Sequence, residues 1–528
     1  MFDIRGLMLD SARLTEQRSV YRDYITFAAQ WNYNALFWHF TDDQGCSLVF
    51  PRRPELASPH AYTQKEMRAL IAFAARHGLD VIPEIECFGH ASFITNHPRY
   101  QHLKDGVPGK LFGALCVFEP AARAILRDLL RDAAETFPSK YLHVGMDETA
   151  FGAHPTSAQL LKNKPKYELY AEHVKWLHSE VTTLGKTMMM WADHLYPISK
   201  AELAKATYLD ADSINSKIAE MLPRDIIMCV WQYSPKPKRA YVEHLQRLGF
   251  QVLVCPATSA WGLMVHPRTW NLDNLRDSAQ LAKSTKALGM VNTVWCPQRY
   301  FPGTTLFGIA YSAVCRDSRN AAPPYAKFVR ETFGIAKPVR VVSALKVLHA
   351  VMVHKNILAH VLPIANENLE NVKPAEWRAL NMMSDAAQRA FERLRVMRPC
   401  VQRNLVYYDD ILFAAHCMSE LGTHVVFIRL VLKIRNATRA VTAQETVEKA
   451  HGLTRAMLVL LQRKVGGLLR EARQRWNATR FADDPKRTHG SSSADTDALL
   501  ARLIGTEKFY TNMCKELSAD MRRSAGRS

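Results

Sequence analysis

Gly78-Leu79-Asp80-Val81-Ile82-Pro83-Glu84 is the stretch that decides the fold. It follows an amphipathic helical pattern over residues 63–77, which begins with the capping-box letters Thr63-Gln64-Lys65-Glu66. A glycine after a helix supplies the left-handed residue that closes it. The apolar run after Gly78 is typical of a strand that is buried on both faces. The stretch therefore predicts a helix that returns by a short turn to a buried strand.

The same unit recurs through the first 300 residues. Three further glycines precede apolar runs: Gly185 before 188–191, Gly249 before 252–255 and Gly289 before 291–295. Four more apolar runs lie at 7–9, 35–38, 141–144 and 226–231. Eight short strands that alternate with helices match the count and length of an α/β fold of the (β/α)8 TIM barrel type. A doubly wound open sheet is the competing fold, but no Gly-x-Gly-x-x-Gly turn follows the first strand.

The second half of the chain has a different pattern. Strand signals stop near Pro323, and long helical patterns follow at 374–398 and 443–473. A polar segment near 483–497 is typical of a loop. We therefore expect two domains, a catalytic TIM barrel over 1–322 and an α-helical, basic C-terminal domain over 323–528.

The positive charge is concentrated in that second half. Residues 321–528 hold 33 Lys and Arg against 19 Asp and Glu, whereas residues 1–320 hold 36 against 31. A solvated basic surface on helices is the simplest interpretation, and binding of an anionic polymer by the helical half is an alternative. We expect no nucleic-acid partner.

The remaining composition indicates a cytoplasmic protein. The ten cysteines form no Cys-x-x-Cys pair, and several lie in apolar runs, as buried thiols do in a reducing compartment. The first residues show no secretory signal, although a trimmed start would leave secretion open. The sequence contains no run of about 18 apolar residues, the length needed to span a membrane. A homodimer is compatible with the sequence, which does not require one.

The expected carboxyl ends of the strands carry acids, histidines and tryptophans. In a barrel of this kind the active site lies at these ends. Indole rings stack on sugar C–H faces while carboxylates hold hydroxyls, so the set favours a carbohydrate site. Its members are Asp10, His39, Asp42, Asp43, Glu84, Glu86, His90, Asp147, Glu148, Trp191, Trp231 and Trp295.

The Asp147-Glu148 dipeptide needs a particular backbone to act as a pair. Neighbouring residues of a regular strand point to opposite faces, so both carboxylates reach one pocket only if the strand ends or twists there. Gly145 makes such an end plausible.

Several segments resemble the β-N-acetylhexosaminidases, glycoside hydrolase family 20. The segments are RGLMLD (5–10), WHFTDDQG (38–45), VIPEI (81–85) with Gly89-His90, and HVGMDE (143–148). Later segments resemble the hexosaminidase D branch, which lacks an N-terminal α+β domain: WAD (191–193), VWQY (230–233), TSAWG (258–262), and Trp295 with QRY (298–300). The resemblance covers about residues 1–320.

The resemblance implies an exo-hydrolase that removes terminal non-reducing N-acetylglucosamine or N-acetylgalactosamine from a glycan or glycoconjugate. The substrate's own acetamido oxygen would attack the anomeric carbon and form an oxazolinium ion, with retention of configuration and without a metal or cofactor. Glu148 would be the general acid and then base, and Asp147 would orient the acetamido group. The other implied roles are hydroxyl binding by Arg5, Asp42 and His90, and walls formed by Trp191, Trp231 and Trp295.

The chain departs from the family pattern at three places. Met146 replaces a second glycine, and Trp295-Cys296-Pro297 replaces Trp-Gly-Glu. The tyrosine that holds the acetamido oxygen has no clear match, and Tyr233 or Tyr300 could replace it. These departures motivate the alternative of a non-catalytic glycan-binding member.

A second alternative is a metal-dependent barrel hydrolase. Its candidate ligands are His39, Asp42, Glu84 and His90. The chain has no His-x-His or His-Glu-x-x-His spacing to support it.

Overall fold

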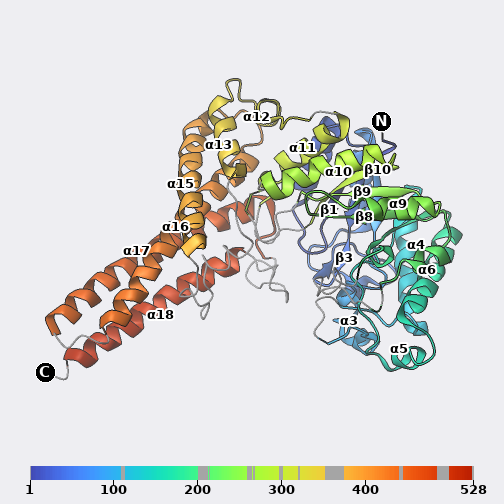
Figure 1. Ribbon diagram of the computed structural model, residues 1–528, viewed down its shortest axis with the longest axis horizontal. Coiled ribbons are helices and arrows are strands. Elements are labelled where there is room, and N and C mark those ends of the chain that lie inside the picture. The colour runs from blue at the N-terminus through green and yellow to red at the C-terminus, as the bar shows by residue number, and fades with distance from the viewer. Residues whose placement is uncertain are drawn as a thin grey trace. The chain divides into compact units, whose positions relative to one another are not determined.

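The computed structural model describes residues 2–108, 113–199, 212, 214–258, 264–265, 268–295, 301–318, 321–350, 374–438, 444–483 and 499–525. The chain forms two compact units (Figure 1). The barrel unit comprises Met1–Ser259, Trp270–Cys296 and Gly308–Pro323, and the helical unit comprises Ala260–Thr269, Pro297–Phe307 and Pro324–Ser528. The division differs from a cut at residue 322 in two short stretches that belong with the helical unit. Most of the predicted polar loop, most of TSAWG, and Cys296, Pro297 and Tyr300 lie outside the described residues.

The barrel unit is a closed barrel of eight parallel strands. Their order is β1-β10-β9-β8-β7-β6-β5-β2. The strands are β1 (Ile4–Asp10), β2 (Ala35–His39), β5 (Asp80–Glu84), β6 (Tyr141–His143), β7 (Thr187–Trp191), β8 (Ile227–Trp231), β9 (Val252–Cys255) and β10 (Gly289–Val294). All eight predicted strands are confirmed to within three residues, and the TIM barrel is confirmed with them.

Side chains from alternate strand positions fill the barrel interior. Leu7 of β1 pairs with Leu36 of β2 on one side and with Asn292 of β10 on the other, which closes the sheet. The interior cluster consists of Ile4, Met8, Ala35, Phe37, Ile82, Met189, Trp191, Ile227, Cys229, Leu253, Cys255 and Val291. The barrel is therefore a packed core, and chemistry is restricted to its ends.

Helices alternate with the strands (Figure 1). They are α1 (Arg18–Gln30), α2 (Gln64–Arg76), α3 (Ser92–Thr95), α4 (Pro120–Thr136), α5 (Pro155–Leu160), α6 (Lys166–Thr183), α8 (Lys217–Met221), α9 (Arg239–Arg247), α10 (Asp273–Ser284) and α11 (Leu306–Asp317). The predicted capping box is confirmed, because Thr63 Oγ1 accepts from the Glu66 amide and Glu66 Oε2 accepts from the Thr63 amide.

The glycines that were expected to close helices divide into two kinds. Gly78, Gly185 and Gly249 have φ of 74°, 71° and 92°, as predicted. Gly289 is different, because it is the first residue of β10 and Lys286, at φ 53°, follows helix α10 instead. A Cβ at Gly289 would lie 2.1 Å from the carbonyl oxygen of Ile4, so close strand pairing explains this glycine.

The sequence did not predict a small hairpin in the loop after β2. Strands β3 (Thr41–Asp42) and β4 (Gly45–Cys46) pair antiparallel. The hairpin turns the backbone directly after His39, and Asp42 lies fully buried in it.

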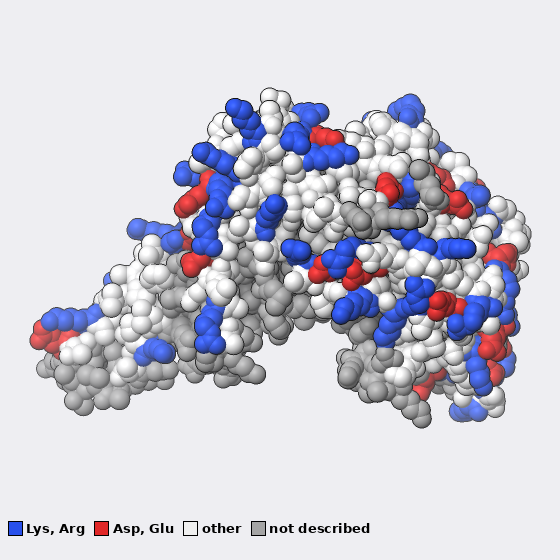
Figure 2. All heavy atoms as spheres, turned by 45° about the horizontal axis from the view of Figure 1, so that its top comes forward, with Lys and Arg blue, Asp and Glu red and all other residues white. Residues whose placement is uncertain are grey.

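The helical unit contains α12 (Tyr325–Phe333), α13 (Val339–Ala350), α15 (Pro374–Met397), α16 (Leu405–Thr438), α17 (Gln444–Thr479) and α18 (Leu499–Ala525). The two long predicted helices correspond to α15 and α17. Figure 2 shows Lys and Arg side chains scattered among uncharged ones over both units, with fewer acids among them. Among the described helices none combines the length and apolarity needed to cross a membrane.

Candidate active site

Asp42 is the centre of a charged network at the carboxyl ends of β1, β2 and β5. Its Oδ2 lies 2.8 Å from the Arg13 guanidinium, 3.0 Å from His39 Nε2 and 3.4 Å from His90 Nδ1. Burial alone would raise the pKa of Asp42, but Arg13 and His90 hold it well below its usual range. The site therefore contains a permanent anion that is surrounded by nitrogen donors.

His90 connects this anion to the Asp147-Glu148 pair. Its Nε2 lies 3.2 Å from Glu148 Oε2 and 3.7 Å from Asp147 Oδ2. Burial alone would lower the pKa of His90, but Asp42 and Asp147 raise it well above its usual range. The side chain is therefore an imidazolium that has carboxylates on both sides.

A second buried carboxylate, Glu84, fixes the orientation of an indole. Its Oε1 accepts from Trp191 Nε1 at 2.6 Å and lies 3.3 Å from His39 Nδ1. Burial alone would raise the pKa of Glu84, but His39 and His143 lower it overall. The Trp191 ring, which ends β7, is therefore held by a charge-assisted hydrogen bond.

The catalytic turn, defined as residues 145–149, follows β6. Gly145, Met146 and Glu148 have φ of 65°, 86° and 47°, in the left-handed region. This region costs a residue other than glycine about 1–3 kcal/mol. The strand alternation that would separate neighbouring side chains ends here, so Asp147 and Glu148 both reach His90. The left-handed backbone therefore allows two consecutive carboxyl groups to face one site.

Met146 keeps the conformation that a glycine would favour. Its amide donates to Glu86 Oε2 at 3.2 Å, and its carbonyl accepts from the Tyr170 hydroxyl at 2.8 Å. The side chain is fully buried. The departure at Met146 therefore leaves the pair in place, which removes one reason to favour a binding-only protein.

The Asp147 carboxyl has a raised pKa. Burial raises its pKa to about 7, assisted by Asp193 and Glu148 and opposed by His90. Its Oδ1 is buried and makes no hydrogen bond to the described residues. A buried acceptor without a protein donor is open to a donor from water or from a ligand.

Aromatic side chains lie beside the charged network. The Trp191 and Trp295 rings are 5.9 Å apart, and the Arg13 guanidinium lies 5.1 Å from the Trp295 ring centre. Trp231 stacks on Tyr233 at 5.1 Å, and Trp295 Nε1 donates to the Tyr233 hydroxyl at 2.7 Å. The structure thus brings the three predicted tryptophans and Tyr233 together.

The structure does not bring Arg5 to this group. Arg5 lies at the amino end of β1, where its guanidinium donates to the carbonyls of Asn32 and Phe2. Arg13, eight residues later and past the carboxyl end of the same strand, binds both Asp10 and Asp42 at 2.8 Å. The strand direction alone would have favoured Arg13, because the expected site lies at carboxyl ends.

Sequence reasoning also gave no role to Asp193 and His194. Both are fully buried just after β7. Asp193 Oδ2 accepts from the Glu148 amide at 2.9 Å, and His194 Nε2 accepts from the Thr149 amide at 3.0 Å. Asp193 belongs to the WAD segment (191–193) that resembles the family, and this segment was the signal that could have found the dipeptide.

Some site residues could hold a metal ion by distance alone. Three groups have mutually close ligand atoms: His39, Glu84 and Glu86; Asp42, Asp43 and His90; and His90, Asp147 and Glu148. However, neighbouring carboxylates raise the pKa of His39 and of His90 well above the usual range. A histidine ligand must be deprotonated, so a metal ion at these groups would have to displace a proton from the imidazole.

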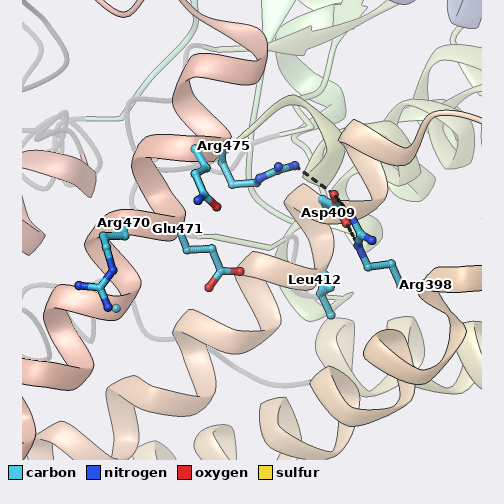
Figure 3. A pocket seen from close by; sticks show the side chains of 8 residues that line it. Arg398, Asp409, Leu412, Arg470, Glu471 and Arg475 are labelled. Carbon is cyan, nitrogen blue, oxygen red and sulfur yellow. Dashed lines mark hydrogen bonds and ion pairs between the residues drawn. The ribbon is translucent and has the colours of Figure 1, made fainter.

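The helical unit has a pocket of its own, with a volume of about 430 Å³ (Figure 3). Arg398 and Arg475 bind Asp409, at 2.7 Å and 3.5 Å. His416 Nδ1 lies 2.8 Å from Glu471 Oε2. Both carboxylates of this pocket are therefore paired with side chains of the helical unit.

A TIM barrel with buried carboxylates and a row of indoles at its strand ends defines a glycoside hydrolase of the barrel class. The chain belongs to glycoside hydrolase family 20: the family model "Glycosyl hydrolase family 20, catalytic domain" matches residues 2–295. The family that the sequence resembles is thereby confirmed.

Individual relatives are similar over the barrel. A beta-hexosaminidase of Vibrio furnissii is 30% identical over 243 residues, which are 38% of this chain and 39% of that one. Hexosaminidase D of Bos taurus is 26% identical over 282 residues, 49% of this chain and 76% of its own length. A solved beta-N-acetylhexosaminidase of Bacteroides fragilis has a TM-score of 0.48 at 20% identity, covering 62% of this chain and 69% of that one. The chain spans about two fifths of the length of the Vibrio relative.

Proposed function

We propose that the protein is an exo-β-N-acetylhexosaminidase that removes terminal non-reducing N-acetylglucosamine or N-acetylgalactosamine from glycans. The observation that carries the proposal is the left-handed catalytic turn, which presents Asp147 and Glu148 side by side to His90. Two carboxylates with different surroundings can take two different roles. The binding-only relative remains the alternative outcome of the test.

In the first step Glu148 protonates the glycosidic oxygen as the bond to the anomeric carbon breaks. The acetamido oxygen of the substrate attacks that carbon and forms the oxazolinium ion. The buried Oδ1 of Asp147, which has no donor among the described residues, accepts the acetamido N–H. As positive charge develops on the ring, it stabilises the carboxylate form of Asp147.

In the second step Glu148, now a carboxylate, takes a proton from a water molecule that attacks the anomeric carbon. The carbon–oxygen bond of the oxazolinium breaks and the acetamido group is restored. Two displacements leave the configuration retained. His90 donates to Glu148 throughout, and Asp42 holds His90 charged.

Orientation of the acetamido group should accelerate the reaction more than general acid catalysis does. A well-oriented internal nucleophile has an effective molarity of about 10⁵–10⁸ M, whereas general acid catalysis supplies about 10²–10⁴-fold. Asp147 and the aromatic walls, which would orient the acetamido group, are therefore as important as Glu148.

The test is turnover of the p-nitrophenyl β-glycosides of N-acetylglucosamine and N-acetylgalactosamine. We expect release of p-nitrophenol by the full chain and a loss of about 100-fold or more in Glu148→Gln. NMR of the first sugar released should show the β-anomer. Binding of the free sugar by calorimetry without any turnover would instead establish the binding-only alternative, and the α-anomer as first product would exclude the oxazolinium route.

We also propose a reducing, cytoplasmic site of action. Each of the nine cysteines in the described residues is a free thiol, and seven of them are buried. Full activity in excess dithiothreitol, with the activity of tagged protein in the soluble cell fraction, would support it, whereas activity that requires oxidation would contradict it.

A further inference from the structure

The amides of the catalytic turn donate to side chains of neighbouring strands and loops. The Gly145 amide donates to His143 Nδ1 and the Met146 amide to Glu86 Oε2. The Glu148 amide donates to Asp193 Oδ2 and the Thr149 amide to His194 Nε2. The acceptors are His143, Glu86, Asp193 and His194, and each is fully buried. The ladder to β7 ends where the Gly145 carbonyl accepts from the Trp191 amide, so buried side chains hold the amides of the turn.

Asp193 and His194 hold the half of the turn that carries the general acid. They are consecutive residues that begin the 3-10 turn Asp193–Leu195, directly after Trp191 and Ala192. Their two bonds, at 2.9 Å and 3.0 Å, receive two consecutive amides of the facing loop. A left-handed residue such as Glu148, with φ of 47°, needs outside contacts to persist.

The imidazole of His194 is itself held in place. It stacks on the Tyr170 ring at 4.5 Å, with 22° between the planes. The Tyr170 hydroxyl donates to the carbonyl of Met146, in the same turn. Because Nε2 accepts from the Thr149 amide, it carries no proton in this arrangement.

We propose that Asp193 and His194 are positioning residues for the hydrolysis: by accepting the amides of Glu148 and Thr149, they hold Glu148 in the conformation that directs its carboxylate to His90 and to the leaving group. The inference rests on the proposed function. It assigns to the Asp193-His194 dipeptide a task in acid catalysis although neither side chain touches the reacting atoms.

Leaving-group dependence tests this role. A 2,4-dinitrophenyl glycoside needs little protonation as it leaves, whereas the methyl glycoside needs a well-placed acid. In His194→Phe, kcat/KM for the methyl β-glycoside of N-acetylglucosamine should fall by about 10–100-fold. The kcat/KM for the dinitrophenyl glycoside, which reports only the steps up to departure of the leaving group, should fall less than about threefold.

Variants that keep a hydrogen-bond acceptor at positions 193 and 194 should restore activity on the methyl glycoside. The amide oxygen of His194→Gln can accept from the Thr149 amide, so kcat/KM for the methyl glycoside should recover most of the loss. Likewise Asp193→Asn keeps an acceptor for the Glu148 amide, whereas Asp193→Leu removes it and should behave as His194→Phe does.

The matched control is His424→Phe, a fully buried histidine of the helical unit. It should leave the ratio of the two kcat/KM values unchanged. Equal losses on both glycosides, or His194→Gln as impaired as His194→Phe, would overturn the positioning role while leaving the proposed function intact. A wild-type protein that turns over neither glycoside would overturn both proposals. Circular dichroism of each variant confirms that it is folded. A variant that is unfolded is replaced by its alanine counterpart, Asp193→Ala or His194→Ala, which removes the same acceptor and must show the same ratio.

Discussion

The Nε2 atom of His90 lies 3.2 Å from Oε2 of Glu148, while its Nδ1 faces Asp42 at 3.4 Å. The His90 imidazole therefore connects Asp42 to Glu148 and gives the Glu148 side chain a fixed donor. Arg13 is the second cation of this chain of charges, bound to Asp42 at 2.8 Å. The site is therefore an ordered series of alternating charges.

The two arginines of β1 and its following loop should differ in their effect on catalysis. Arg13→Ala removes a cation that bridges Asp10 and Asp42 beside Trp295, so kcat/KM should fall by about 100-fold, or about 2.7 kcal/mol. Arg5→Ala, at the amino end of the strand, should leave kcat/KM within about twofold. Steady-state kinetics on the chromogenic glycosides checks both, and a larger loss in Arg5→Ala would restore the original sequence prediction.

The fall of kcat/KM at low pH should follow the protonation of Asp147. Its pKa is raised to about 7 by burial and then by Asp193 and Glu148, and the reaction needs its carboxylate to accept the acetamido N–H. As pH falls through 7, kcat/KM should therefore fall about tenfold per unit. Asp193→Asn removes a neighbouring negative charge, so the acid limb should move to lower pH. An acid limb that does not move would show that another group controls it.

Ionisation of Asp147 should also lower the stability of the folded protein. The folded state has a pKa of about 7, above the ordinary unfolded value of about 3.9. A raised carboxyl pKa means that stability is lost as pH rises from 3.9 to 7, and the full cost applies above 7. Asp147→Asn should therefore raise the unfolding free energy at pH 8 by up to about 4 kcal/mol, with little gain at pH 4. Urea unfolding at both pH values measures this, and an equal change at both would refute it.

The eight strands could be predicted because apolar runs and helix-closing glycines are local signals. The contacts of the site are not local. Arg5 lies at the amino end of β1, whereas Arg13 lies past its carboxyl end, and only the direction of the strand separates their surroundings. The positioning role proposed for Asp193 and His194 depends on the loop that faces them. The backbone of Met146 could not be anticipated, since a methionine at φ 86° is held by Glu86 and Tyr170 from other elements. Tertiary partners thus decide what the motif alone leaves open.

Tyr233 should hold the acetamido oxygen. Its hydroxyl accepts from Trp295 Nε1 at 2.7 Å, and its ring stacks on Trp231 at 5.1 Å, so it lies among the aromatic side chains that would surround the acetamido group. Tyr233→Phe should lower kcat/KM by about 10–100-fold, the usual loss for one donor to a developing charge. It should weaken binding of a thiazoline analogue of the intermediate by a similar factor. An unchanged analogue affinity would assign the acetamido oxygen to another donor.

Replacement of Gly145 should be far more damaging than replacement of Gly78, which supplies a matched control. Both have positive φ, 65° and 74°, so alanine at either position meets the same backbone strain of about 1–2 kcal/mol. At Gly78 a Cβ would meet nothing within 4 Å, whereas at Gly145 it would lie 1.9 Å from Glu86 Oε2. Gly78→Ala should therefore cost only the strain and leave kcat unchanged. Gly145→Ala must displace Glu86, which accepts the Met146 amide, so it should cost about 3 kcal/mol or more and lower kcat about 100-fold. Equal unfolding free energies for the two variants would show that the turn tolerates a side chain at Gly145, and the account of how Asp147 and Glu148 come to face one imidazole would have to change.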